Sequence, residues 1–332
     1  MQQVQTLTGR RVATRSASNS AVSIGVTIGI RFALYVDLML LFGLPLFGLY
    51  ALRGAERFQS AVLPIRAFVL WLAASAICLS VLSIVAMTAS MAGVSIGEVD
   101  RASVGTMITQ TPMGIAWQVR IATLFIAICV AVAVGARGNP VWLVVVCLGS
   151  ATALASLAWT GHGAATDGFA GARHLTADVV HLLAAGGWLG ALAALATLLF
   201  QPLSSRTESQ LRLLHRILHE FSLVGAIIVA LIFVSGLVNS WVLVGPTHLL
   251  SMTGTLYGQL LLAKLVLFAA MLVLAAINRF RLTPAIDHAI QAGETFGAVQ
   301  RLRKSLFMET GAAIAIIGLV AWLGTLEPPM SM

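Results

Sequence analysis

The sequence contains few charged residues. Of its 332 residues, 10% are charged and 59% are hydrophobic, and the mean hydropathy is +0.95. Soluble domains carry about 25% charged residues, so this composition excludes an ordinary soluble protein and indicates an integral membrane protein. Acidic residues are fewer than basic ones, 12 against 20, so the net charge is +8. In a membrane protein an excess of basic residues indicates how the chain is oriented in the membrane, and we expect no nucleic-acid partner.

Cysteine is scarce as well. Cys78, Cys129 and Cys147 form no CxxC pair, and each lies in a different hydrophobic run. Such positions are typical of small buried side chains and do not suggest a disulfide or a thiolate metal-binding domain. The sequence also lacks a Walker A lysine motif and a phosphorylatable aspartate motif, which argues against transport driven directly by ATP. We expect a protein that is not an enzyme.

What the sequence does contain is a series of long apolar runs. Each is long enough for the roughly 20 residues that a bilayer core requires, and uniformly apolar runs of this length favour helices over barrel strands. We therefore predict an all-α polytopic membrane bundle of about eight transmembrane helices. It forms a single transmembrane domain over 23–332, after a disordered basic tail at 1–22. The predicted helices are 28–50, 66–91, 114–135, 140–160, 174–200, 220–244, 258–278 and 306–326.

The distribution of basic residues predicts the orientation. Loops on one side of the predicted bundle and their edges hold twelve Arg and Lys residues, from Arg53 to Lys304, whereas the opposite loops hold only Arg101 and Arg173. Basic residues accumulate on the cytoplasmic side, so both termini should be periplasmic. The tail disagrees, because it carries Arg10, Arg11 and Arg15. We give the loops more weight than three residues in a tail rich in Ser and Thr.

The segment 161–190 combines membrane length with ionisable residues. His162 lies at the end of one predicted helix, and His174, Asp178 and His181 lie on one face of the next, at spacings of four and three. Charged and polar groups inside a membrane are costly and usually functional. The two helix histidines are about 10 Å apart along the axis, so they fit successive ligand positions better than one shared ion. Asp178, which lies between them, is placed to orient an imidazole or relay protons.

Two methionines suggest which metal such a site takes. Met87 and Met91 are four residues apart near the same predicted end of the bundle. Thioethers select Cu(I), and imidazole accepts copper in either oxidation state. We therefore predict a copper site with the ligands His162, His174, His181, Met87 and Met91.

Three further charges fall inside predicted helices. We expect Asp37, Arg120 and Lys264 to compensate one another together with Asp178, either as a purely structural ion-pair network or as a polar lining that relays protons or metal. On the basic side, His215 and His219 have metal-ligand spacing. The sequence leaves open whether they form a copper exit site or a solvated helix turn.

The ordered motifs of the second half resemble the copper resistance protein D (CopD) family of bacterial inner-membrane proteins. The resemblance is strongest over 156–284 and less distinct in the first four helices. Ala191 stands where the family often has glycine. The motifs are Gly161-His162-Gly163, Asp178-x2-His181 through Trp188-Leu189-Gly190, Phe221-Ser222, Ser235-Gly236 through Asn239 and Trp241, Tyr257-Gly258 through Lys264, and Asn278-Arg279 through Pro284.

The resemblance implies copper transport across the inner membrane, from periplasm to cytoplasm, in copper homeostasis and resistance. It also implies a partner, a periplasmic copper-binding protein of the CopC type, which we expect to be a separate chain because no such domain is fused here. Two alternatives stay open. One is a copper-binding sensor or assembly factor without flux. The other is a membrane b-type cytochrome, which needs paired histidines at matching depth.

Overall fold

The computed structural model of the chain describes residues 2–60, 62–133, 139–160, 168–199, 208–244, 252–292 and 295–326. Within these ranges the regular structure is helical, without strands. Eight of the helices are long and apolar enough to cross a membrane. The predicted all-α bundle with eight spans is therefore confirmed.

The eight spans lie in eight long helical segments, with short helices between them. The long ones are α1 (Gln2–Ala51), α2 (Ile65–Ala92), α4 (Pro112–Ala133), α5 (Val141–Ala155) with the 3-10 turn η4 (Ser156–Thr160), α6 (Gly168–Leu199), α7 (Glu208–Val244), α8 (Leu256–Ile277) and α10 (Thr295–Leu323). The short ones include η1 (Gly54–Phe58), η2 (Ile96–Glu98), α3 (Arg101–Gln110), the π-helix η9 (Asn278–Leu282) and α9 (Thr283–Ala292).

Several helices begin earlier than the hydropathy pattern predicts. Helices α7 and α10 begin at Glu208 and Thr295, about three turns before the expected starts. These first turns carry charged residues, so hydropathy marks where a helix enters the apolar layer and misses its polar beginning. Helix α1 begins at Gln2 and includes most of the segment expected to be disordered. No side chain before Ile24 is described, and the disordered tail stays a prediction.

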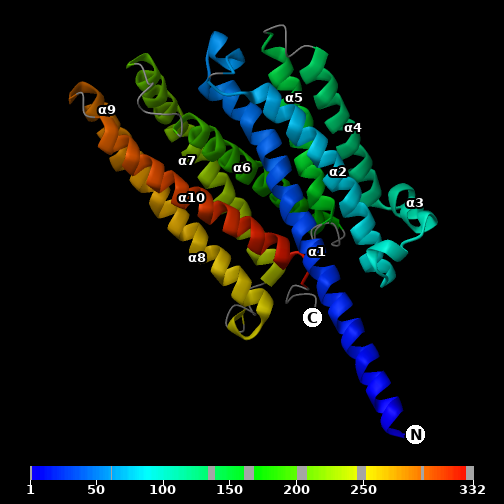
Figure 1. Cartoon of the computed structure of the whole chain (residues 1–332). Coiled ribbons are helices and arrows are strands. Elements are labelled where there is room, and N and C mark those ends of the chain that lie inside the picture. The colour runs from blue at the N-terminus through cyan, green and yellow to red at the C-terminus, as the bar shows by residue number, and fades with distance from the viewer. Residues whose placement is uncertain are drawn as a thin grey trace.

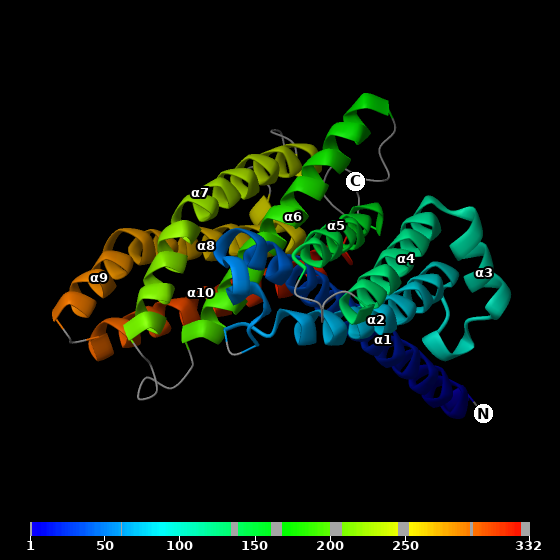
Figure 2. The same ribbon diagram turned by 90° about the horizontal axis from the view of Figure 1, so that it is seen from above.

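Helices α1 and α6 form the centre of the bundle. They are the two most buried spans. Helices α2, α4 and α5 lie on one side of this pair, and α7, α8 and α10 lie on the other (Figures 1 and 2). We call the end where the first span begins at Ile24 and α10 ends at Leu323 the termini face. The opposite end is the basic face, which carries Arg53, Arg57, Arg66, Arg212, Arg216, Arg279, Arg281, Arg301, Arg303 and Lys304.

Glycines allow α1 and α6 to cross at close range. A Cβ on Gly43 would lie 2.7 Å from Cα of Gly190, and a Cβ on Gly190 would lie 2.7 Å from the Gly43 carbonyl oxygen. Real Cβ atoms essentially never approach another atom this closely. Gly186, one turn before Gly190, faces Phe42 and Leu154. This spacing of small residues is a common helix-packing device in membranes, where backbones must approach closely to gain van der Waals contact.

Candidate metal site

Three polar residues of α6 line one cavity in the half of the bundle near the termini face. His174, Asp178 and His181 share a cavity of about 210 Å³ with residues of α1, α7, α8 and α10. The three residues therefore share one face of α6, as their spacing predicts, and this face is directed toward the neighbouring helices. Because α6 is an unbroken helix from Gly168 to Leu199, the two histidines keep their separation of about 10 Å along the axis.

His174 is buried with free ligand capacity. Its side chain is 2% exposed, and neither ring nitrogen has a hydrogen-bond partner in the described part of the chain. Nε2 lies 3.7 Å from Oδ2 of Asp178, which is within ion-pair distance and too long for a hydrogen bond. A neutral imidazole carries one nitrogen lone pair that can bind a metal. At His174 no hydrogen bond from the described parts of the chain competes for that lone pair, so the residue fits a metal ligand.

His181 is oriented by α7. Its Nδ1 lies 3.0 Å from Oγ of Ser235, and that hydroxyl donates to the Leu231 carbonyl oxygen at 2.5 Å. With the single hydroxyl proton used there, the tautomer that carries its proton on Nδ1 donates to Ser235 and leaves the Nε2 lone pair for a metal. Fixing one nitrogen by a hydrogen bond so that the other faces the metal is the usual arrangement around a ligand histidine.

Asp178 is held by an amide and balanced by a lysine. Asn239 Nδ2 donates to Oδ1 of Asp178 at 2.6 Å, and the charge of Lys264 interacts with the same carboxylate. Lys264 lines the cavity too. Asp178 and Lys264 therefore face the same cavity with opposite charges, and Arg31 adds a further basic side chain to its lining.

The other two predicted charges have serine partners elsewhere, although Nη2 of Arg120 is buried without a hydrogen-bond partner among the described residues. Asp37 is 6% exposed and accepts hydrogen bonds from Ser75 Oγ at 3.0 and 3.1 Å. Arg120 is 1% exposed and donates from Nε to Ser156 Oγ at 2.8 Å. Neither is among the described residues that line the histidine cavity. In the described part of the chain no ion pair joins Asp37 or Arg120 to Asp178 or Lys264, and a relay role for these two residues stays a prediction.

The two methionines occupy different environments. Met87 lines a second cavity, of about 280 Å³, together with Arg31 and Tyr35 of α1. Arg31 and Tyr35 also line the histidine cavity, so the two cavities are neighbours with a shared wall. Met91 is 70% exposed and lines neither of them. The geometry thus supports Met87 as a residue on the way to His174, and it places Met91 at the surface.

His162 lies outside the described residues, so its predicted role stays a prediction. Among the described residues, no group of three or more His, Cys, Asp or Glu side chains is close enough to hold a metal ion. Within the described residues the two α6 histidines therefore stand apart along the helix and form no closed coordination cage.

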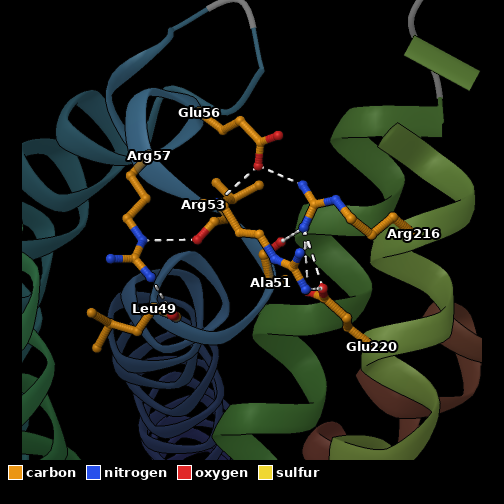
Figure 3. A network of polar contacts seen from close by, with 8 residues as sticks. Leu49, Ala51, Arg53, Glu56, Arg57, Arg216 and Glu220 are labelled. Carbon is orange, nitrogen blue, oxygen red and sulfur yellow. Dashed lines mark hydrogen bonds and ion pairs between the residues drawn. The ribbon is translucent and has the colours of Figure 1, made fainter. Parts of the chain in front are cut away.

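On the basic face, His215 and His219 do not converge on a shared site. Nε2 of His215 lies 3.9 Å from Oδ1 of Asp287 in α9, while His219 is exposed. The neighbouring charges bind α7 to the end of α1 (Figure 3). Arg216 pairs with Glu56 at 2.5 Å and with Glu220 at 3.4 Å. His215 and His219 therefore lie beside a charged contact between helices.

Two partners in the site, Ser235 and Asn239, are absent from the predicted ligand set. They are four residues apart on α7 and thus share the face that meets His181 and Asp178. Two polar residues four positions apart in an otherwise apolar helix are the feature of the sequence that indicates them. Arg31 and Tyr257 also line the histidine cavity, and only the packing of α1 and α8 brings them there.

The fold and the site define a multi-pass membrane protein with imidazole and thioether groups along cavities between its helices. Family models agree with this class. The model of the N-terminal domain of copper resistance protein D-like proteins matches residues 21–172, and the copper resistance protein D model matches residues 215–323. The first half of the chain therefore matches the family as well, although its motifs are less distinct.

Two curated relatives cover nearly the whole chain. Copper resistance protein D of Pseudomonas syringae pv. tomato is 46% identical over 92% of this chain and 97% of its own length. Inner membrane protein YebZ of Escherichia coli K12 is 28% identical over 91% of this chain and 98% of its own. The chain belongs to the copper resistance protein D family. No solved structure matches it.

Proposed function

We propose that this protein binds copper and moves it across the bacterial inner membrane, from periplasm to cytoplasm, and so contributes to copper homeostasis and resistance. The observation that carries the proposal is His174, a buried imidazole with neither nitrogen hydrogen-bonded to any described residue, which lines a cavity shared with His181. Membership of a family named for copper resistance indicates that the metal is copper. Copper is the cargo in this proposal and not a resident cofactor.

The path begins at the termini face. Met91 at the surface and Met87 in the neighbouring cavity offer thioether ligands, which select Cu(I). His162 would add an imidazole near the entrance. Copper then passes to His174 and to His181, one ligand at a time, because about 10 Å separates the two along α6. Asp178, held by Asn239, orients the site or relays protons, and Lys264 balances its charge. Asp37 and Arg120 support the helices around this path through their serines.

The charges at the two ends support the orientation of the protein in the membrane. Basic residues concentrate on the basic face, and such residues mark the cytoplasmic side. The termini face is then periplasmic, which places the methionine and histidine positions where a separate periplasmic copper-binding protein of the CopC type would deliver the metal. The relative YebZ is named as an inner membrane protein, in agreement with this location.

Copper binding and uptake by the purified protein in liposomes test the proposal. We expect His174→Ala and His181→Ala each to lower copper affinity and to abolish uptake. The matched control is His288→Ala, which removes an exposed histidine of α9 far from the cavity and should leave both unchanged. Circular dichroism and size-exclusion profiles establish that each variant stays folded.

The outcomes separate the alternatives. Copper binding without uptake by the wild type would indicate a sensor or an assembly factor. No copper binding, or a haem absorption band in the purified protein, would overturn the proposal. Equal losses in His174→Ala and His288→Ala would show that the cavity is not the site.

A further inference from the structure

A separate cavity lies in the half of the bundle near the basic face, between α6, α7, α8 with η9, and α10. Its volume is about 330 Å³, and its walls are mainly leucine, alanine and aromatic side chains. The polar side chains among its described lining are Ser222, Asn278, Arg279, Thr283 and Glu309, together with the indole of Trp188. None of these residues belongs to the predicted copper path.

Glu309 is a buried carboxyl group inside a membrane span. It is 2% exposed, and it lies within the span Phe296–Leu323. Asn278 Nδ2 donates to its Oε2 at 2.7 Å, while Oδ1 of Asn278 is buried without a hydrogen-bond partner in the described structure. A carboxyl group at this depth is costly, and such groups commonly mark ion or proton pathways.

The backbone at Asn278 is irregular. Asn278 begins the π-helix η9, and its carbonyl oxygen accepts a hydrogen bond from Thr283 Oγ1 at 2.9 Å. Single π-turns inside α-helices occur frequently at functional sites. Here the turn interrupts the helical segment that runs from α8 into α9, at the residue that holds the Glu309 carboxyl group.

The chemistry of this cavity does not suit copper. The described lining contains no His, Met or Cys, so it lacks the soft and imidazole ligands that copper prefers. The side chains of Glu309, Asn278, Ser222 and Thr283 offer five oxygens in all, which is fewer than the six to eight oxygen ligands that Ca²⁺ takes. A carboxyl group needs no further ligand to bind a proton.

Glu309 also lacks the fixed counter-ion that a structural ion pair would give it. The charged or titratable residues of the described lining are Arg279 from η9 and Glu309 from α10, and none comes from α6, α7 or α9. No ion pair joins Arg279 to Glu309 in the described residues, and the Arg279 guanidinium lies 5.3 Å from the centre of the Phe280 ring. Arginine stays charged at every relevant pH, so Glu309 is the group in this cavity that can change its charge.

The cavity adjoins the copper path through one side chain. Trp188 lines it and also lines a cavity of about 160 Å³ that contains His181 and Lys264. The Trp188 ring lies 5.7 Å from that of Phe221, which lines the cavity that contains Glu309. From His174 to Leu199, a single face of α6 borders cavities over about 37 Å, which is longer than the roughly 30 Å thickness of a bilayer core.

We propose that Glu309, held by Asn278, is a proton-binding site that couples proton movement to copper passage. The inference rests on the proposed transport function. A proton from water forms an O–H bond with one carboxyl oxygen of Glu309. That bond breaks when the proton returns to water, so no other reactant is required. Movement of Trp188 and Phe221 when copper occupies His181 connects the two sites.

The first test does not depend on copper transport. Dicyclohexylcarbodiimide reacts with protonated carboxyl groups in apolar surroundings, and mass spectrometry of the full-length protein in liposomes locates the adduct. We expect Glu309 to be labelled, with less labelling as the pH rises. Glu98, an exposed carboxyl group in η2, is the internal control and should stay unlabelled. Absence of label on Glu309 at every pH would overturn the proposal.

The second test measures copper uptake together with the pH inside the liposomes. In the wild type we expect proton movement to accompany copper uptake. In Glu309→Gln we expect it to fall at least tenfold, while copper binding to the histidine cavity stays unchanged. Glu98→Gln should behave as wild type. Proton movement that persists in Glu309→Gln would refute the coupling role. If wild-type protein binds copper without uptake, transport fails, and the labelling result alone decides whether Glu309 binds a proton.

Discussion

The crossing of α1 and α6 makes a quantitative prediction for Gly190→Ala. The new Cβ would lie 2.7 Å from the Gly43 carbonyl oxygen, whereas ordinary contacts of Cβ atoms begin near 3.4 Å. The two helices must therefore separate by at least 0.7 Å. Since the obstacle is backbone and not a flexible side chain, we expect the upper end of the cost of overpacking, about 3 kcal/mol.

Helix propensity acts in the opposite direction. Alanine is favoured over glycine in a helix by about 1 kcal/mol, which leaves a net loss of about 2 kcal/mol for Gly190→Ala. Gly187→Ala is the matched control on the same helix. Its Cβ would meet only side-chain atoms of Ile228 and Leu46, at 3.4 Å. We expect that variant to be neutral or slightly more stable than the wild type.

The assay is the free energy of unfolding in mixed micelles, measured by titration with a denaturing detergent. The double variant Gly43→Ala with Gly190→Ala should cost less than the sum of the single variants, because one separation of the helices relieves both clashes. Equal stabilities for Gly190→Ala and Gly187→Ala would refute the close-crossing argument. Strictly additive losses would show that the two glycines do not meet.

Two further predictions concern the site and the termini face. Ser235→Ala removes the hydrogen bond that orients His181, and we expect copper affinity to fall about 10- to 100-fold in a binding titration without loss of folding; an unchanged affinity would mean that the bond does not position the ring. Near the termini face, hydrogen bonds from the Ser103 hydroxyl and backbone N–H lower the pKa of Asp100 from its ordinary 3.8. The cap on α3 is therefore fully present above pH 3.8 and is lost as the pH falls through the lowered value. The protection of amides 101–110 from hydrogen exchange, relative to their intrinsic rates, should fall in that acid range, and Asp100→Ala should remove this pH dependence; the same dependence in the variant would contradict the assignment.

Much of the helix pattern was readable from the sequence because hydropathy is a local property. A run of about 20 apolar residues must be helical in a bilayer, whatever its neighbours are. The polar beginnings of α7 and α10 were not readable in this way. Residues 208–219 and 295–305 are helical but carry charges, and their helical state depends on amphipathic packing and no longer on the bilayer.

Within the candidate site, the sequence by itself determined which residues share a helix face. The spacing of His174, Asp178 and His181 fixes their common direction at 3.6 residues per turn. Likewise, the chemistry of these residues and of Met87 indicates copper. This much follows from one helix, without knowledge of what packs against it.

Only the tertiary structure decided which groups meet. Asp37 bonds Ser75 and Arg120 bonds Ser156, although charge alone would have paired these two with each other. Met87 lines a cavity while Met91, one turn away, is exposed. Glu309 has its hydrogen-bond partner, Asn278, on another helix. Each of these partnerships depends on the rotation and depth of two helices relative to one another, which is set by packing such as the glycine crossing of α1 and α6 and is not encoded in the spacing along either helix.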